Sequence, residues 1–165
     1  AIIEEYSRTQ PVLVEHSLSH KILASHNPAV AKTDFRIDLF KSPRESNFFH
    51  AVSNSYPNFQ SYPNVAVSCL LNFDAIKPLI NGQKRSYFLK AIVDCVVFDP
   101  RDNYKPKYFF EIDSSYHDNP EQERKDRWKD EFFSLAGQRL YRIRQDAKSV
   151  STEEYERLVH EIIAT

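Results

Sequence analysis

Three acidic residues occur in two segments that are otherwise rich in apolar side chains, and their types and spacing could support chemistry. Asp94 follows Val93 in one segment, and Glu111 and Asp113 flank Ile112 at the end of the other. Side chains two residues apart in a strand lie on the same face, so Glu111 and Asp113 are expected to point the same way. If the two segments pair as a hairpin, Asp94 joins them at one end of a sheet.

Three carboxylates at the end of a buried sheet repel one another and lose hydration, which a divalent cation would offset. Mg²⁺, or Mn²⁺ in its place, suits such a group because Mg²⁺ takes one or two carboxylates and leaves its other positions to water and a phosphate. The bound ion would acidify a water molecule and polarise the phosphate, which is the chemistry of phosphodiester hydrolysis. Asp94, Glu111 and Asp113 are therefore the expected metal ligands. The alternative for Asp94 and Asp113 is that backbone amides or an arginine satisfy the carboxylate.

Two lysines and a histidine could complete this site. Lys125 and Lys129 lie about 40° apart around a predicted helix, close enough to reach the sheet end together. They flank an apolar stripe that is expected to pack toward the sheet: Trp128, Phe132, Leu135 and Ala136. A lysine there would stabilise transition-state charge or orient the attacking water. Solvated helix charges explain the lysines equally well, and His117, in the preceding loop, could instead make a structural hydrogen bond.

Capping residues and hydrophobic periodicity predict the elements that must position these side chains. Ser42, Pro43 and Glu45 form a capping box, and Asn119 and Gly137 bound a later helix. The expected helices cover residues 43–55, 120–136 and 152–164, with a helical turn over 74–80. The expected strands cover residues 64–70, 88–98, 108–112 and 140–143, the middle two as a hairpin.

These elements predict a mixed α/β domain with a central sheet flanked by helices. The nuclease-like domain is expected over residues 42–165, and residues 1–41 are interpreted as an N-terminal extension or linker. Within that extension, short strands are possible at residues 12–14 and 35–39. The chain has 165 residues, 41% of them hydrophobic, which is enough for one core.

The net charge of -1 provides no global basic field, so nucleic-acid binding would need a local patch. Lys84–Arg85 and Arg139–Arg144, with Tyr87 and Tyr141 among them, could line a DNA backbone, although a solvated charged face explains them about as well. The chain has two glycines, which leaves no glycine-rich phosphate loop for a small phosphate ester.

Cys69 and Cys95 lie in apolar runs and are expected to be buried free thiols, without the spacing of a zinc site. No apolar run approaches 18 residues, and no signal sequence is recognisable. We therefore expect a cytoplasmic protein with no membrane partner.

The segments 91–98, 109–117 and 124–137 together resemble the PD-(D/E)xK nuclease superfamily. The resemblance covers residues 42–144 and is strongest to a bacterial branch similar to very-short-patch-repair endonucleases. It implies a restriction-endonuclease-like fold and a metal-dependent nuclease, with DNA as the expected substrate. It also implies that Asp94 and Glu111 are metal ligands and that Glu45 is an acidic residue beside the site.

One departure from the family pattern concerns the catalytic lysine. The family usually has lysine two residues after the glutamate, where this chain has Asp113. By the resemblance, Lys129 on the following helix is the first candidate to replace it and Lys125 the second, while His117 would assist the attacking water. The missing strand lysine leaves an alternative, namely a catalytically inactive nucleic-acid-binding or assembly module of the same fold. A homodimer or a larger nucleic-acid-processing assembly is the expected partner in either case.

Overall fold

The computed structural model describes residues 12–15, 21–24, 33–34, 36–113, 119–144 and 150–164. The chain divides into two compact units, Ala1–Asp38 and Leu39–Thr165. In the first unit, β1 (Val12–Glu15) pairs antiparallel with β2 (Lys21–Ala24). The strand expected at 12–14 is thus present, whereas residues 36–39, expected to be a strand, form none.

The second unit is built on a four-stranded mixed sheet of β3 (Gln60–Ala66), β4 (Ile92–Asp99), β5 (Lys105–Asp113) and β6 (Leu140–Arg144), in that spatial order. The first two pairings are antiparallel and the β5–β6 pairing is parallel. The predicted hairpin joins β4 to β5 through the short 3-10 helix η4 (Pro100–Asp102). A parallel neighbour for β5 needs a crossover, which a helix provides.

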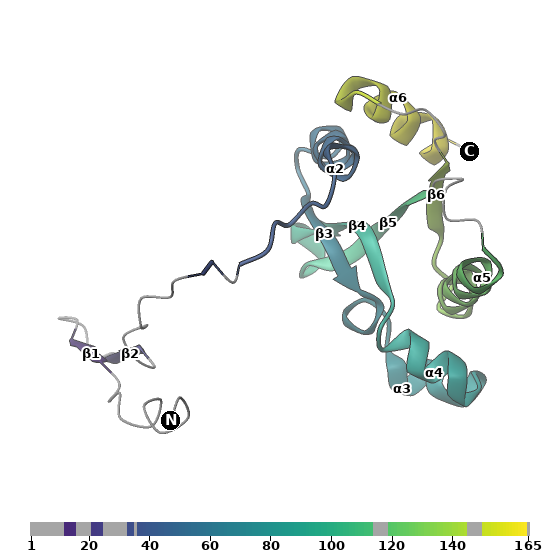
Figure 1. Cartoon of the computed structure of the whole chain (residues 1–165), viewed down its shortest axis with the longest axis horizontal. Coiled ribbons are helices and arrows are strands. Elements are labelled where there is room, and N and C mark those ends of the chain that lie inside the picture. Colours follow the sequence, from purple (N-terminus) through teal and green to yellow (C-terminus); the bar gives the residue numbers. More distant parts are fainter. Residues whose placement is uncertain are drawn as a thin grey trace. The chain divides into compact units, whose positions relative to one another are not determined.

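Helices cover both faces of this sheet. Figure 1 shows α2 (Pro43–Ser55) and α6 (Thr152–Ile163) on one face and α3 (Phe73–Ile76), α4 (Gly82–Phe88) and α5 (Pro120–Leu135) on the other. The 3-10 helices η2 (Val67–Cys69) and η3 (Lys77–Leu79) flank α3. The second unit is therefore a three-layer α/β/α arrangement, in agreement with the predicted mixed α/β class.

The long helices begin where the sequence predicts. Ser42, Asn119 and Ser151 each accept a hydrogen bond from the backbone N–H three residues later, which satisfies a donor that the first helical turn leaves free. Helix α5 ends at Leu135, and Gly137 follows in the left-handed region with φ 65°. Local capping chemistry thus fixes the start of α2, α5 and α6 and the end of α5.

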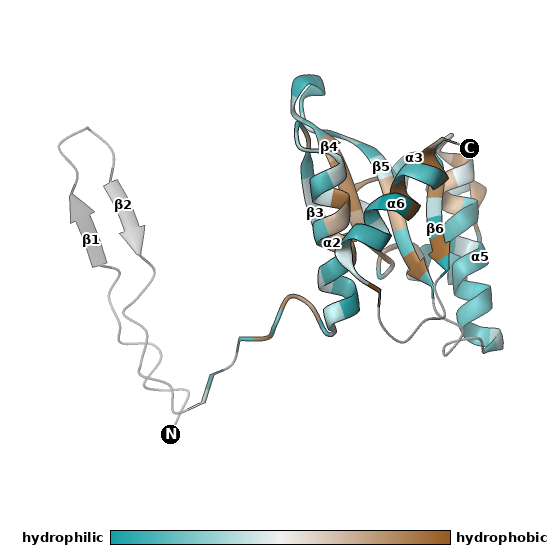
Figure 2. Ribbon diagram, turned by 90° about the horizontal axis from the view of Figure 1, so that it is seen from above, coloured by the Kyte–Doolittle hydropathy of each residue, from teal (hydrophilic) through white to brown (hydrophobic). Residues whose placement is uncertain are grey.

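Two separate hydrophobic cores hold the layers together, and Figure 2 shows the hydrophobic residues concentrated on the strands. The core beneath α2 and α6 contains Phe48, Val52, Val97, Phe110, Ile143 and Tyr155. The core beneath α3, α4 and α5 contains Phe88, Val93, Val96, Phe109, Phe132 and Phe133. Adjacent residues of β4 and β5 therefore serve opposite cores, as expected for a sheet that is buried on both faces.

Two predicted strands have different bounds in the structure. The strand expected over 64–70 runs from Gln60 to Ala66, and Pro63 lies within it because β3 is an edge strand with one side free of ladder bonds. The strand expected over 88–98 begins only at Ile92, because α4, which is capped by Asn81, extends through Phe88.

The predicted apolar stripe of α5 and the predicted burial of both cysteines were each wrong in part. Leu135 is 42% exposed, while Trp128, Phe132 and Ala136 do pack against the core. Phe133 and Lys129 are buried in addition, so the inward face of α5 is rotated from the predicted stripe. Cys69 is exposed at the end of η2, whereas Cys95 is a buried free thiol as expected.

The contrast between two residues of α5 gives a test of this packing. Phe132 is fully buried and its ring packs against Phe88 with a centroid distance of 5.1 Å. We expect Phe132→Ala to lower the free energy of unfolding by about 3–5 kcal/mol. Leu135→Ala, on the same helix, should change it by less than about 1 kcal/mol because its side chain is exposed. Urea denaturation of both variants measures the difference, and equal losses would contradict this packing.

Candidate functional site

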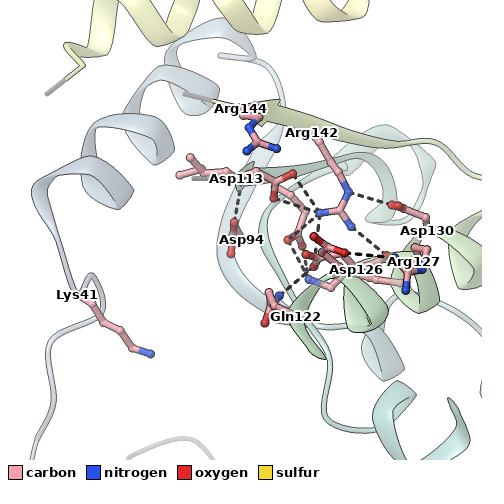
Figure 3. A pocket seen from close by; sticks show the side chains of 13 residues that line it. Lys41, Asp94, Asp113, Gln122, Asp126, Arg127, Asp130, Arg142 and Arg144 are labelled. Carbon is pink, nitrogen blue, oxygen red and sulfur yellow. Dashed lines mark hydrogen bonds and ion pairs between the residues drawn. The ribbon is translucent and has the colours of Figure 1, made fainter. Parts of the chain in front are cut away.

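A charged pocket of about 740 Å³ lies where β4, β5 and β6 meet one face of α5. Its acidic lining residues are Asp94, Glu111, Asp113, Glu123, Asp126 and Asp130, and its basic ones are Lys41, Arg127, Lys129, Arg142 and Arg144. Figure 3 shows several of these side chains directed toward one another. All three carboxylates singled out in the sequence therefore line the same pocket.

Asp94 lies where β4 and β5 stop pairing. The ladder between the two strands begins at Cys95 and Phe110, and Asp94 is the next residue toward the pocket. Its Oδ2 accepts a hydrogen bond from the backbone N–H of Ile112 at 2.8 Å. A side chain thus replaces the missing ladder bond, and the Asp94 carboxylate is held beside Glu111 on the neighbouring strand.

Glu111 and Lys129 form a buried ion pair. The Lys129 Nζ donates to both carboxylate oxygens of Glu111, at 2.8 and 2.9 Å, and to the carbonyl oxygen of Ile92 at 2.9 Å. These three bonds use all three donors of the ammonium group. Glu111 and Lys129 are 5% and 6% exposed. The helix lysine expected to reach the sheet end therefore does so.

Asp113 is paired with an arginine instead of standing free beside the other two carboxylates. Its Oδ1 lies 3.2 Å from Nη1 of Arg142, which projects from the adjacent strand β6. The guanidinium also contacts Asp130 at 3.0 Å and, more distantly, Asp126 and Glu111 at 3.8 and 3.9 Å. Arg44 donates to the backbone carbonyl of Asp113 at 2.8 Å, which helps to fix the end of β5.

The three remaining candidates are placed differently. Glu45 accepts a hydrogen bond from the backbone N–H of Lys41 at 2.9 Å, and it lines a small cavity of about 10 Å³ together with Asp94. Lys125 pairs with Glu121 at 2.7 Å and is not part of the pocket lining, so it behaves as an ordinary solvated helix charge. His117 lies outside the described residues.

Burial dominates the electrostatics of the pocket. Burial and the neighbouring charge of Asp94 raise the pKa of Glu111 to about 7, although Lys129 and Arg142 act in the opposite direction. Burial also raises the pKa of Asp94, while the bond from Ile112 and the charge of Lys129 partly offset the rise. Burial disfavours the charged form of Arg142, but the surrounding carboxylates outweigh it and raise its pKa. Arg142 therefore remains a cation.

The raised pKa of Glu111 makes the stability of the fold depend on pH. Its pKa of about 7 exceeds the ordinary 4.5, so the folded state binds this proton more tightly than the unfolded chain. The resulting stabilisation is present below about pH 4.5 and is lost as pH rises to about 7. Relative to Glu111→Gln, the wild type should lose on the order of 3 kcal/mol over this interval. Urea denaturation at several pH values measures this difference, and parallel curves for the two proteins would contradict it.

The three-carboxylate metal cluster expected from the sequence is not formed. In the described ranges, no group of three or more His, Cys, Asp or Glu side chains is arranged to hold a metal ion. The physical reason is that Arg142 engages Asp113. Asp94 and Glu111 remain as two neighbouring carboxylates, and a pair of this kind suits Mg²⁺, which keeps several water or phosphate ligands.

The fold and this pocket define a mixed α/β protein that carries a buried glutamate–lysine pair and a neighbouring aspartate at the end of its sheet. No model of a known protein family, no curated protein and no solved structure shows significant similarity to the chain. Across the helices that the structure describes, none has the length and apolar character required to cross a membrane.

Proposed function

We propose that this protein is a metal-dependent nuclease of the PD-(D/E)xK type, with a restriction-endonuclease-like fold and DNA as its substrate. The observation that carries the proposal is the buried Glu111–Lys129 pair beside Asp94. An aspartate and a glutamate on neighbouring strands, with a lysine bound beside them, are the residue types that this chemistry needs. The lysine comes from α5, which supports the view that it replaces the one missing at position 113.

Each of these residues has a distinct role in the proposed site. Asp94 and Glu111 would hold Mg²⁺ or Mn²⁺, and the bound ion would supply an acidified water molecule and a Lewis acid for the phosphate. The positive charge of Lys129 would stabilise the negative charge that develops on the phosphate. The backbone N–H of Ile112 keeps the Asp94 carboxylate oriented toward the pocket.

Exposed cations at the pocket support a nucleic acid as substrate. Lys41, which precedes α2, Arg127 on α5 and Arg144 on β6 all line the pocket and are exposed. Cations placed in this way can bind phosphates on either side of the one that is cleaved. Because the whole chain carries a net charge of -1, this local set is the proposed source of affinity. A homodimer would supply the second site that double-strand cleavage requires.

A second candidate function is an inactive nucleic-acid-binding or assembly module. The observation that favours it is that Lys129 and Arg142 already neutralise Glu111 and Asp113. A pocket whose carboxylates are neutralised by basic side chains can persist without a divalent cation. Such a module would bind nucleic acid without cutting it.

Cleavage assays separate the two functions. Purified protein is incubated with plasmid or single-stranded DNA, with Mg²⁺, with Mn²⁺ or with EDTA. Cleavage with either ion and none with EDTA is the expected result. Retained DNA binding without cleavage of any substrate under either ion would overturn the proposed nuclease and favour the inactive module.

A further inference from the structure

Residues 39–41, called the entry segment because they lead into α2, are anchored to the second unit at three successive positions. The carbonyl oxygen of the first residue accepts a hydrogen bond from the Asn64 side chain at 3.3 Å. The second residue, Phe40, packs its ring against Phe49 with a centroid distance of 5.4 Å. The backbone N–H of the third donates to the Glu45 carboxylate at 2.9 Å. The entry segment is therefore held in place although it belongs to no helix or strand.

The anchor on β3 coincides with an irregularity in that strand. Asn64 has φ 54°, a left-handed conformation that its short polar side chain tolerates. The residues on either side of Asn64 pair with β4, while Asn64 itself is absent from the register of the two strands. Its side-chain amide instead bonds the entry segment. The break in the ladder and the anchor of the entry segment thus involve the same residue.

The entry segment carries Lys41 to the charged pocket. Lys41 lines this pocket and is exposed, and Figure 3 shows it across the pocket from Arg142 and Asp130. In the part of the chain that the structure describes, the Lys41 ammonium group forms no ion pair. Lys129, Arg142 and Arg127 are each paired with a carboxylate. Lys41 can therefore bind an anion without first giving up an internal partner.

We propose that Lys41 binds the phosphate backbone of the nucleic acid on the α2 side of the pocket, and that Glu45 and Asn64 are positioning residues that hold it there. A fixed backbone favours this role, because the segment need not be ordered when the substrate binds. The carboxylate of Glu45 then serves as a hydrogen-bond acceptor for Lys41. This inference rests on the nucleic-acid substrate of the proposed function and is independent of the metal site.

Binding of labelled single-stranded and duplex DNA to the full chain in EDTA tests the role of Lys41 without requiring cleavage. Each phosphate that a cation neutralises contributes about 0.9 to the slope of log Kd against log salt concentration for duplex DNA, and about 0.7 for single strands. Lys41→Gln should lower the slope by that amount and weaken binding on the order of tenfold at about 0.1 M salt. Lys41→Arg should preserve both values. Lys90→Gln is the matched control, because Lys90 is exposed but lies outside the pocket lining.

Two substitutions of Glu45 test its positioning role. Glu45→Gln and Glu45→Ala remove the same negative charge, but only glutamine keeps an oxygen that can accept the N–H of Lys41. Glu45→Ala should therefore bind DNA about two- to tenfold more weakly than Glu45→Gln, the worth of one hydrogen bond. Equal binding by the two variants would overturn the positioning role. Circular dichroism verifies folding, and if Glu45→Ala does not fold, Asn64→Gly decides, because glycine keeps the left-handed backbone and removes the bond to the entry segment. Wild-type affinity in Asn64→Gly would then overturn the role of the anchor.

The outcomes for Lys41 separate this inference from the proposed nuclease. An unchanged slope for Lys41→Gln, with DNA bound by the wild type, would overturn the role of Lys41 and leave the nuclease intact. Binding that depends on Lys41, without cleavage under Mg²⁺ or Mn²⁺, would support the role and overturn the nuclease. No binding of either form of DNA by the wild type would overturn both.

Discussion

For the proposed nuclease, Glu111→Gln and Asp94→Asn should each abolish metal-dependent cleavage of DNA, with a fall in rate on the order of 10³-fold or more. Both substitutions keep the size of the side chain and remove the negative charge that a divalent ion requires. Asp94→Asn can keep its oxygen near the N–H of Ile112, so the end of the β4–β5 ladder should survive. The loss should therefore appear in the cleavage rate, measured as plasmid relaxation with Mg²⁺ or Mn²⁺, while the melting temperature shows whether the fold remains.

Asp102→Asn is the matched control for this pair of variants. Asp102 lies on η4, is 61% exposed and pairs with Lys105 at 3.3 Å. Asp102→Asn removes one negative charge, as the other two substitutions do, but at a position outside the pocket lining. Its cleavage rate should equal that of the wild type. Equal cleavage by all three variants would mean that Asp94 and Glu111 are not the catalytic carboxylates.

The parts of the fold that local chemistry determines could be predicted from the sequence. Each long helix is capped by a hydrogen bond to a residue only three positions further along the chain, so the starts of α2, α5 and α6 follow from short sequence patterns. The caps are Ser42, Asn119 and Ser151. The β4–β5 hairpin follows in the same way from its polar turn. Helix α4 was missed because its cap, Asn81, precedes a short segment whose apolar residues continue into a strand.

The site was predictable only in part because Arg142, which contacts its carboxylates, is brought in by the pairing of β6 with β5. Glu111 and Arg142 are neighbours through the parallel register of β5 and β6, which no local pattern encodes. Arg142 belongs to a basic stretch for which the sequence allows either a DNA backbone path or a solvated charged face, whereas the structure places it among carboxylates. The sequence signal that could have placed Arg142 on the pocket side of its strand is its alternation with Tyr141 and Ile143. Helix periodicity predicted that Lys129, beside the apolar stripe of α5, can reach the end of the sheet, and the structure places it there.

Lys129→Met should destabilise the fold strongly because it leaves Glu111 buried without its partner. Removing one member of a buried ion pair typically costs about 3–5 kcal/mol. The loss should be largest above the pKa of Glu111, about 7, and smaller in mild acid, where the carboxyl group takes up a proton. Urea denaturation at alkaline and mildly acidic pH measures both values. Lys125→Met is the control, because Lys125 makes an exposed helical ion pair with Glu121 that contributes about 0.3–0.5 kcal/mol.

Replacing both Glu111 and Lys129 tests whether the buried ion pair is needed for the stability of the fold or for the proposed reaction. In Glu111→Leu/Lys129→Met neither charge remains to be desolvated, and apolar residues of similar volume can match or exceed the stability of a buried ion pair by about 1–4 kcal/mol. We expect this double variant to be at least as stable as the wild type and unable to cleave DNA. A double variant as unstable as Lys129→Met would show instead that the pair holds the fold together. The expected result would mean that the buried charges are retained for the reaction, because the fold is equally stable without them.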